Sequence, residues 1–150
     1  MAAGTLTLML PPERSKIRHC RACGTAVRHL VPADDNRERA VCPACGTVHY
    51  ENPLNVVGTV PVWGNDQVLL CRRNIEPRRG LWTLPAGFLE LGETTAEGAL
   101  RETIEEAGAR IELGPLFTVL NVTMAGQLHL FYDRQRGRWG HHGVHCEDIG

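Results

Sequence analysis

Seven residues in one short segment stand at spacings that could assemble an acidic site for a cation. The segment reads GFLELGETTAEGALRETIEEAGA, and its distinctive positions are Gly87, Glu93, Arg101, Glu102, Glu105, Glu106 and Gly108. With each residue type at roughly 6–7% usage, seven such coincidences arise about once in 10⁸ starting points. A dense anionic cluster usually needs a cation, and a cation held by oxygens is a common partner of phosphate chemistry. The spacing therefore predicts metal-assisted chemistry on a phosphate.

The glutamates must be positioned by a helix, and the sequence marks both of its ends. Thr94 and Glu97 fit a capping box, and Gly108 ends the helical pattern as a C′ glycine would. Small residues recur at three- and four-residue steps and predict one buried face, made of Ala96, Ala99, Leu100, Thr103 and Ala107. Residues three and four apart are neighbours on a helix, so Glu102, Glu105 and Glu106 should converge on another face.

The acidic face alone allows two interpretations. Two unit charges about 5.5 Å apart repel by roughly 3 kcal/mol at an effective dielectric near 20. On a hydrated helix face the cost is nearer 0.2–0.5 kcal/mol per pair, so a solvated face paired by Arg101 is a reasonable alternative to a metal site. Pro85, Gly87 and Glu93 favour the metal site. A tight turn before the helix would expose backbone carbonyls beside the carboxylates, which suits Mg²⁺.

The segment resembles the signature of the Nudix hydrolases, Gly-x5-Glu-x7-Arg-Glu-U-x-Glu-Glu-x-Gly-U, where U is a bulky apolar residue. Every fixed position is present, and the two U positions hold the smaller Thr103 and Ala109. The family cleaves a diphosphate that links a nucleoside to another group, using Mg²⁺ or Mn²⁺. The resemblance implies that Arg101 and Glu93 orient the acidic side chains. It also implies a set of metal-binding residues: the backbone near Gly87 and the carboxylates of Glu102, Glu105 and Glu106.

Two CxxC pairs near the N-terminus predict a structural zinc site. The pairs are Cys20 with Cys23 and Cys42 with Cys45, and a glycine follows each pair. Their separation lies within the range of a four-cysteine zinc site, and the glycines permit tight knuckle turns. Four unrelated thiols or two redox pairs remain the alternative. So small a segment cannot bury a sufficient core alone, so zinc ligation would supply its stability.

The combination resembles a Nudix subgroup with an N-terminal zinc ribbon, whose relatives act on FAD, ADP-ribose and NADH. The stretch from Asn74 to Glu93 is most similar to the FAD and ADP-ribose pyrophosphatase type. The motif of NADH pyrophosphatases that follows the signature is absent, so NADH is a less favoured substrate. Trp82 could stack on a flat ring, although a strand tryptophan more often packs against the core. A run of arginines could steer phosphates or could be solvated: Arg72, Arg73, Arg78 and Arg79.

Composition limits the remaining possibilities. The chain has 150 residues, 43% of them apolar, and a formal charge of −1, so it has no general attraction to nucleic acid or to anionic membranes. No apolar run approaches membrane-spanning length, and the first residues form a poor secretion signal. We therefore expect a cytoplasmic protein with a small nucleotide-derived substrate and no membrane partner, and we expect nucleic acid not to be a partner. The resemblance also implies a homodimer.

The predicted fold is α+β, a Nudix α/β/α sandwich with a mixed sheet, preceded by a small zinc ribbon. We expect a loose arm at 1–18, the ribbon at 19–50, the Nudix domain at 54–133 and an irregular tail at 134–150. Strand-like runs cover 56–62, 68–70, 81–84, 115–122 and 127–132, with hairpin residues at 64–66 and a turn at 125–126. Cys71 is most simply a strand residue that faces the core.

The tail DRQRGRWGHHGVHCEDIG departs from the resemblance. Family members continue with further strands and a closing helix, so the Nudix domain would be incomplete here, as in a truncated or frame-shifted product. Glu147 and Asp148 are the remaining candidates for a downstream catalytic glutamate. A tail metal cluster of His141, His142, His145 and Cys146 is less expected than disorder. The leading function is Mg²⁺-dependent pyrophosphate hydrolysis, and the rival is an impaired nucleotide-sensing or partner-binding module that uses the zinc ribbon.

Overall fold

The computed structural model describes residues 16–63, 67–74, 76 and 79–134. The chain divides into two compact units between Pro53 and Leu54, and each is considered by itself. The expected hairpin residues at 64–66, Arg78 and the tail candidates lie outside the described residues.

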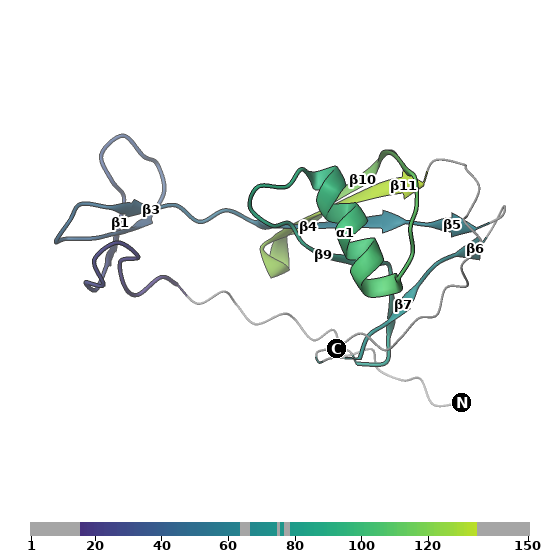
Figure 1. The fold of residues 1–150 in the computed structure, drawn as a ribbon. Coiled ribbons are helices and arrows are strands. Elements are labelled where there is room, and N and C mark those ends of the chain that lie inside the picture. The colour runs from purple at the N-terminus through teal and green to yellow at the C-terminus, as the bar shows by residue number, and fades with distance from the viewer. Residues whose placement is uncertain (1–15, 64–66, 75, 77–78, 135–150) are drawn as a thin grey trace, which may run out of the picture. The chain divides into compact units, whose positions relative to one another are not determined.

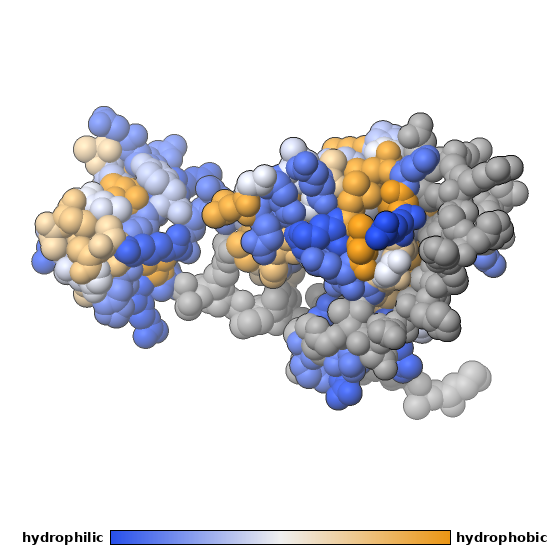
Figure 2. Space-filling view, in the orientation of Figure 1, coloured by the Kyte–Doolittle hydropathy of each residue, from blue (hydrophilic) through white to orange (hydrophobic). Residues whose placement is uncertain are grey.

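The N-terminal unit is a small three-stranded antiparallel sheet with strand order β1-β2-β3. Its strands are β1 (Arg28–Leu30), β2 (Arg39–Val41) and β3 (Val48–His49). Few of its residues are buried, and they include Cys20, Ala40, Cys42 and His49. The face of this unit seen in Figure 2 is correspondingly mostly hydrophilic. So little buried apolar surface cannot offset the entropy of ordering the chain, as expected for a unit that depends on a metal.

The C-terminal unit is built on a four-stranded mixed sheet with strand order β10-β11-β4-β9 (Figure 1). The strands are β4 (Leu54–Val60), β9 (Ala86–Phe88), β10 (Leu113–Val122) and β11 (Gln127–Arg134). β11 is antiparallel to β10 and parallel to β4, and β9 is antiparallel to β4. A short 3-10 turn, η1 (Thr123–Ala125), joins β10 to β11. The pairing places Gly87, on the edge strand β9, next to Val57 on β4.

Two short antiparallel pairs accompany this sheet. β5 (Val62–Trp63) pairs with β6 (Gln67–Val68), and β7 (Cys71–Arg72) pairs with β8 (Trp82–Thr83). Cys71 is 3% exposed and packs with Ala107, Ala109 and Leu69, which confirms that it faces the core. The predicted strand at 68–70 is wrong beyond Val68, because the chain leaves β6 there and starts a new strand at Cys71.

The predicted helix is α1 (Thr95–Ala107), and both of its predicted ends are confirmed. The Thr94 side chain accepts a hydrogen bond from the Glu97 backbone N–H, and the Glu97 carboxylate accepts one from the Thr94 N–H, as in a capping box. Gly108 adopts a left-handed conformation with φ of 60°, which suits glycine. The two caps therefore fix the start and the end of the helix that carries Glu102, Glu105 and Glu106.

The helix lies close to the sheet because small side chains face it. The hydroxyls of Thr103 and of Thr59 on β4 are 2.7 Å apart and fully buried. Gly98 has no room for a side chain, since a Cβ there would meet Val57 at 2.9 Å and Glu93 at 2.7 Å. The smaller residue at the first U position, Thr103, therefore gives a buried polar contact in place of an apolar one. Figure 1 shows α1 crossing the part of the sheet that contains β4 and β9.

Candidate active site

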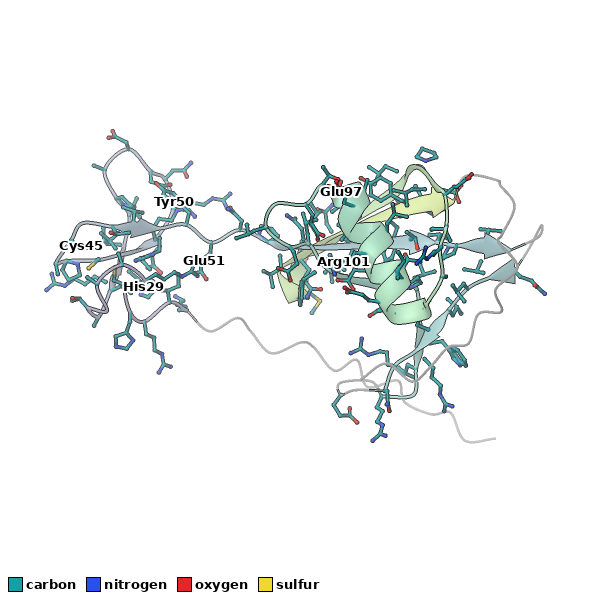
Figure 3. The ribbon with its side chains drawn as sticks, viewed as in Figure 1. His29, Cys45, Tyr50, Glu51, Glu97 and Arg101 are labelled. Atoms are coloured by element: carbon teal, nitrogen blue, oxygen red, sulfur yellow. The ribbon has the colours of Figure 1, made fainter. Side chains whose placement is uncertain are left out.

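Arg101 is the centre of the acidic cluster, and Figure 3 places it in the middle of α1. Its guanidinium forms a bidentate ion pair with Glu93, in which Nε is 3.0 Å from Oε2 and Nη2 is 2.7 Å from Oε1. Nη2 also donates to the backbone carbonyl of Phe88 at 3.0 Å. The Glu93 carboxylate accepts a further hydrogen bond from the Glu90 N–H at 2.7 Å. These bonds tie the loop that follows β9 to the helix.

The remaining terminal nitrogen of Arg101 joins two of the predicted metal ligands. Nη1 donates to Glu102 Oε1 at 2.7 Å and to Glu105 Oε2 at 3.0 Å. The two glutamates differ in exposure, since Glu102 is 9% exposed and the Glu105 side chain is 58% exposed. One guanidinium therefore offsets the repulsion among three carboxylates.

Two backbone positions on β9 contact the other carboxylates. Gly87 packs directly against the carboxylate of Glu102, and any Cβ at Gly87 would overlap that group. The Ala86 N–H donates to Glu106 Oε2 at 2.9 Å. The structure thus brings together the glycine, the arginine and all four predicted glutamates. The sequence predicted a role for the backbone near Gly87, but not the specific bonds of the Ala86 N–H and the Phe88 carbonyl, because a backbone group carries no signal in residue type.

The surroundings lower the pKa of Glu93 and raise the pKa of Glu106. The bonds from Arg101, and then the Glu90 N–H, lower the pKa of Glu93 from 4.5 to about 2. Burial raises the pKa of Glu106 above its ordinary value, in spite of its bond to the Ala86 N–H. The pKa of Arg101 is raised, first by Glu93 and then by Glu102. Arg101 and Glu93 therefore stay charged at neutral pH, as an orienting pair requires.

The lowered pKa of Glu93 predicts a specific acid sensitivity. A carboxylate with a folded-state pKa below its unfolded value adds stability at high pH, which is lost as pH falls. Here the loss should run from about pH 4.5 down to about pH 2. Glu93→Gln should be less stable at pH 7 and should lose stability less steeply over this interval than the parent. Urea unfolding at several pH values measures this. Glu90→Gln, from the same turn, is the control, and identical slopes for all three proteins would contradict the prediction.

The donor set suits a hard divalent cation, but its carboxylates are not gathered around a single point. Three carboxylates beside backbone groups of β9 are the kind of oxygen ligands that Mg²⁺ and Mn²⁺ take. Among the described residues, however, only the four cysteines bring three or more potential ligand atoms within 4.8 Å of one another. The Arg101 Nη1 atom bridges Glu102 and Glu105 instead. The metal roles of Gly87 and the three glutamates stay predictions.

The residues predicted to bind substrate lie on the β7–β8 pair or, for Arg73, directly after β7. Arg72 and Trp82 are opposite each other in the ladder, and Arg72 Nε donates to the Gly80 carbonyl at 3.2 Å. Trp82 is 63% exposed, so the prediction that it packs against the core is wrong. The positive charge of Arg73 acts on Glu106, where it favours the ionised carboxylate. Arg73 is therefore connected to the glutamates by charge, and the binding roles of all three residues stay predictions.

The four cysteines of the N-terminal unit form the second site. Their sulfur atoms lie within 4.8 Å of one another, although the pairs Cys20–Cys23 and Cys42–Cys45 come from separate knuckles. The hydroxyl and the N–H of Thr47 lower the pKa of Cys45 to about 6. A thiolate is the form that binds a metal, and four of them around one point suit tetrahedral Zn²⁺. Figure 3 shows Cys45 within this unit.

Sequence comparison agrees with this geometry. The NUDIX domain profile matches residues 53–150, which is more than half of the chain. The chain belongs to the Nudix family. The zinc ribbon profile described as Nudix N-terminal matches residues 18–51, around the four cysteines. The Nudix fold and the zinc ribbon predicted from the sequence are thereby confirmed.

Solved structures and curated proteins include several similar Nudix proteins. A NUDIX hydrolase from Nitrosomonas europaea has a TM-score of 0.74 and 45% identity, covering 79% of this chain and 66% of that one. The NAD-capped RNA hydrolases NudC of Photorhabdus laumondii and Pseudomonas aeruginosa (strain PAO1) are 31% and 35% identical over 96 residues. Those matches cover 63% of this Nudix chain and 34% and 32% of the two relatives. The chain thus matches about a third of these curated relatives' length.

A bifunctional NMN adenylyltransferase/ADP ribose pyrophosphatase from Francisella tularensis shares the fold. Its TM-score is 0.55 at 21% identity, covering 67% of this Nudix chain and 32% of that one. Such a likeness supports the architecture alone.

The described part of the chain contains no helix whose length and apolar character would let it span a membrane.

Proposed function

We propose that this Nudix protein hydrolyses the pyrophosphate bond of a nucleoside diphosphate derivative, FAD or ADP-ribose first, with Mg²⁺ or Mn²⁺ as cofactor. The observation that carries the proposal is the arrangement around Arg101, which gathers Glu93, Glu102 and Glu105 beside strand β9, where Gly87 packs against Glu102. A solvated acidic face needs no buried glutamate. Glu102 is nevertheless 9% exposed and seated against a glycine that leaves it room.

The chain's own residues would divide the work of hydrolysis. Glu102, Glu105 and Glu106 would hold the cation, with the β9 backbone near Gly87 beside them. A bound divalent cation neutralises the phosphates and lowers the pKa of a coordinated water. A carboxylate would accept the proton from the attacking water. The oxygen of that water adds to one phosphorus atom, the bridging P–O bond breaks, and two phosphate-bearing products leave.

The β7–β8 pair is the proposed substrate-binding element. Trp82 offers an exposed ring, and Arg72 is its neighbour across the ladder. A stacked ring contributes binding energy at little entropic cost, and guanidinium groups pair well with phosphate. Arg73 follows β7 directly, and its positive charge acts on Glu106 of the catalytic cluster.

Several substrates of this class remain candidates. The sequence favours FAD or ADP-ribose, whereas the similar NudC proteins are named for NAD-capped RNA. In all of these, and in NADH, a pyrophosphate joins the 5′ position of adenosine to another group. The names of the relatives therefore reopen two expectations, that nucleic acid is not a partner and that NADH is less favoured.

The deciding experiment measures the products of purified, folded protein with each dinucleotide, with and without Mg²⁺. AMP should appear from FAD, ADP-ribose or NADH, or a 5′-monophosphate RNA from NAD-capped RNA, only when Mg²⁺ or Mn²⁺ is present. Trp82→Ala should raise KM for the preferred substrate more than it lowers kcat. Nucleotide binding without any hydrolysis would contradict the proposal and favour the rival, a nucleotide-sensing module.

Two further expectations belong to this proposal. The cytoplasm is the proposed compartment, because four reduced thiols are required at the zinc site. A homodimer is proposed as well, and the ten-residue β10, which pairs only with β11 among the described residues, exposes Phe117 and Leu120 on a strand without charges. Sedimentation of the purified chain as a monomer at micromolar concentration would refute the dimer.

A further inference from the structure

One nitrogen atom of Arg101 bridges two carboxylates of the proposed metal site. Nη1 is 2.7 Å from Glu102 Oε1 and 3.0 Å from Glu105 Oε2, so a single positive group is shared by both. The glutamates are not among the side chains that gather three ligand atoms within 4.8 Å in the described residues. A divalent cation would need these same oxygens as ligands.

Arg101 is held in this position by bonds that do not involve Glu102, Glu105 or Glu106. Nε and Nη2 grip the two oxygens of Glu93, and Nη2 also donates to the Phe88 carbonyl. Glu93 is itself fixed by the Glu90 N–H. Only Nη1 bonds to Glu102 and Glu105. Nε and Nη2 therefore anchor the guanidinium, whereas Nη1 pairs with the two carboxylates.

The two shared carboxylates are not equally free to leave Arg101. Glu102 is nearly buried and seated against Gly87, whereas the Glu105 side chain is 58% exposed. The Glu105 carboxylate accepts a hydrogen bond from Arg101, and this bond lies at the exposed edge of the cluster. Glu105 can therefore turn toward a cation at low cost, because an exposed ion pair contributes little.

We propose that Arg101 is an internal cation that competes with the divalent metal for Glu102 and Glu105. Metal binding breaks the bonds of Nη1, first to Glu105, while the grip on Glu93 stays intact. Arg101 thus keeps the carboxylates paired when no metal is bound, and it lowers the affinity of the site. The inference rests on the proposed metal site and adds a role for Arg101 beyond orienting the glutamates.

The test is calorimetric titration of metal-free, folded protein with Mn²⁺, without substrate. Arg101→Gln should bind Mn²⁺ at least about five-fold more tightly than the parent, since the metal no longer displaces a bonded cation. Arg110→Gln, which removes an exposed arginine of the same unit, should change the affinity by less than about two-fold. Equal or weaker binding by Arg101→Gln would overturn the inference and show that Arg101 only organises the site.

A second variant and a thermal measurement distinguish competition for the metal from misfolding of Arg101→Gln. Arg101→Lys keeps the charge but cannot grip Glu93 and reach both other carboxylates, so it should also bind Mn²⁺ more tightly than the parent. The thermal midpoint of Arg101→Gln should be lower than that of the parent without metal, and saturating Mn²⁺ should narrow this gap. A gap that does not narrow would contradict the competition. Absence of Mn²⁺ binding by the parent protein even when ADP-ribose or FAD is present would instead refute the proposed function.

Discussion

Glu105→Gln should lower the turnover of a dinucleotide pyrophosphate by roughly 10²–10⁴-fold, the range spanned by catalytic acid–base groups. Glutamine keeps the size of the side chain but removes the charge that a cation needs. The fold should be unaffected, because Glu105 is an exposed helix residue whose bond to Arg101 is one of five that Arg101 makes. The measurement is kcat at saturating Mg²⁺ with the preferred substrate, together with the thermal midpoint.

Glu112→Gln is the matched control for this prediction. Glu112 is an exposed glutamate of the same unit that lies beyond the end of α1, so its loss changes the net charge equally. The control should retain the parental rate. A Glu105→Gln protein with an unchanged rate would remove Glu105 from the mechanism, and one that fails to fold would show that its role is structural.

Removal of zinc should unfold the N-terminal unit and spare the C-terminal unit. Zinc ligation supplies about 10–16 kcal/mol of apparent binding free energy in small zinc-finger peptides, far more than a core of this size provides. All three tryptophans lie after residue 54, so tryptophan fluorescence reports only on the C-terminal unit. After chelation the fluorescence transition should persist, while the backbone amides of residues 18–51 should lose protection from hydrogen exchange.

Two cysteine variants separate zinc ligation from general thiol chemistry. Cys42→Ser should abolish the single zinc per chain, because Cys42 is a buried member of the four-cysteine cluster. Cys71→Ser should keep the zinc, since Cys71 is buried in the other unit. Retention of a folded, protected ribbon after complete zinc removal would contradict the structural role of the metal.

Features encoded by neighbouring residues were predictable from the sequence. The helix caps at Thr94 and Gly108 depend on local hydrogen bonds and backbone freedom, and both lie where they were predicted. The four cysteines meet because the knuckle spacing restricts where they can lie. The period of the helix places Glu102, Glu105 and Glu106 on one flank of α1, although their carboxylate oxygens do not gather around one point in the described residues.

Features that depend on contacts distant in the chain were missed. Trp82 was expected to pack inside, but the short β7–β8 pair leaves its ring 63% exposed. The order of the strands, with β11 between β10 and β4, follows from packing and was not predicted. The position of Arg101 between two carboxylates depends on a backbone carbonyl at Phe88, which residue type does not reveal.

The most direct test of the central claim is the calorimetric uptake of Mg²⁺ or Mn²⁺ by folded protein in the presence of ADP-ribose or FAD. We predict saturable binding by the parent chain and its loss when Glu102, Glu105 and Glu106 are all replaced by glutamine. If the folded parent takes up no divalent ion under these conditions, or if the triple variant binds it equally well, the account of this site is wrong.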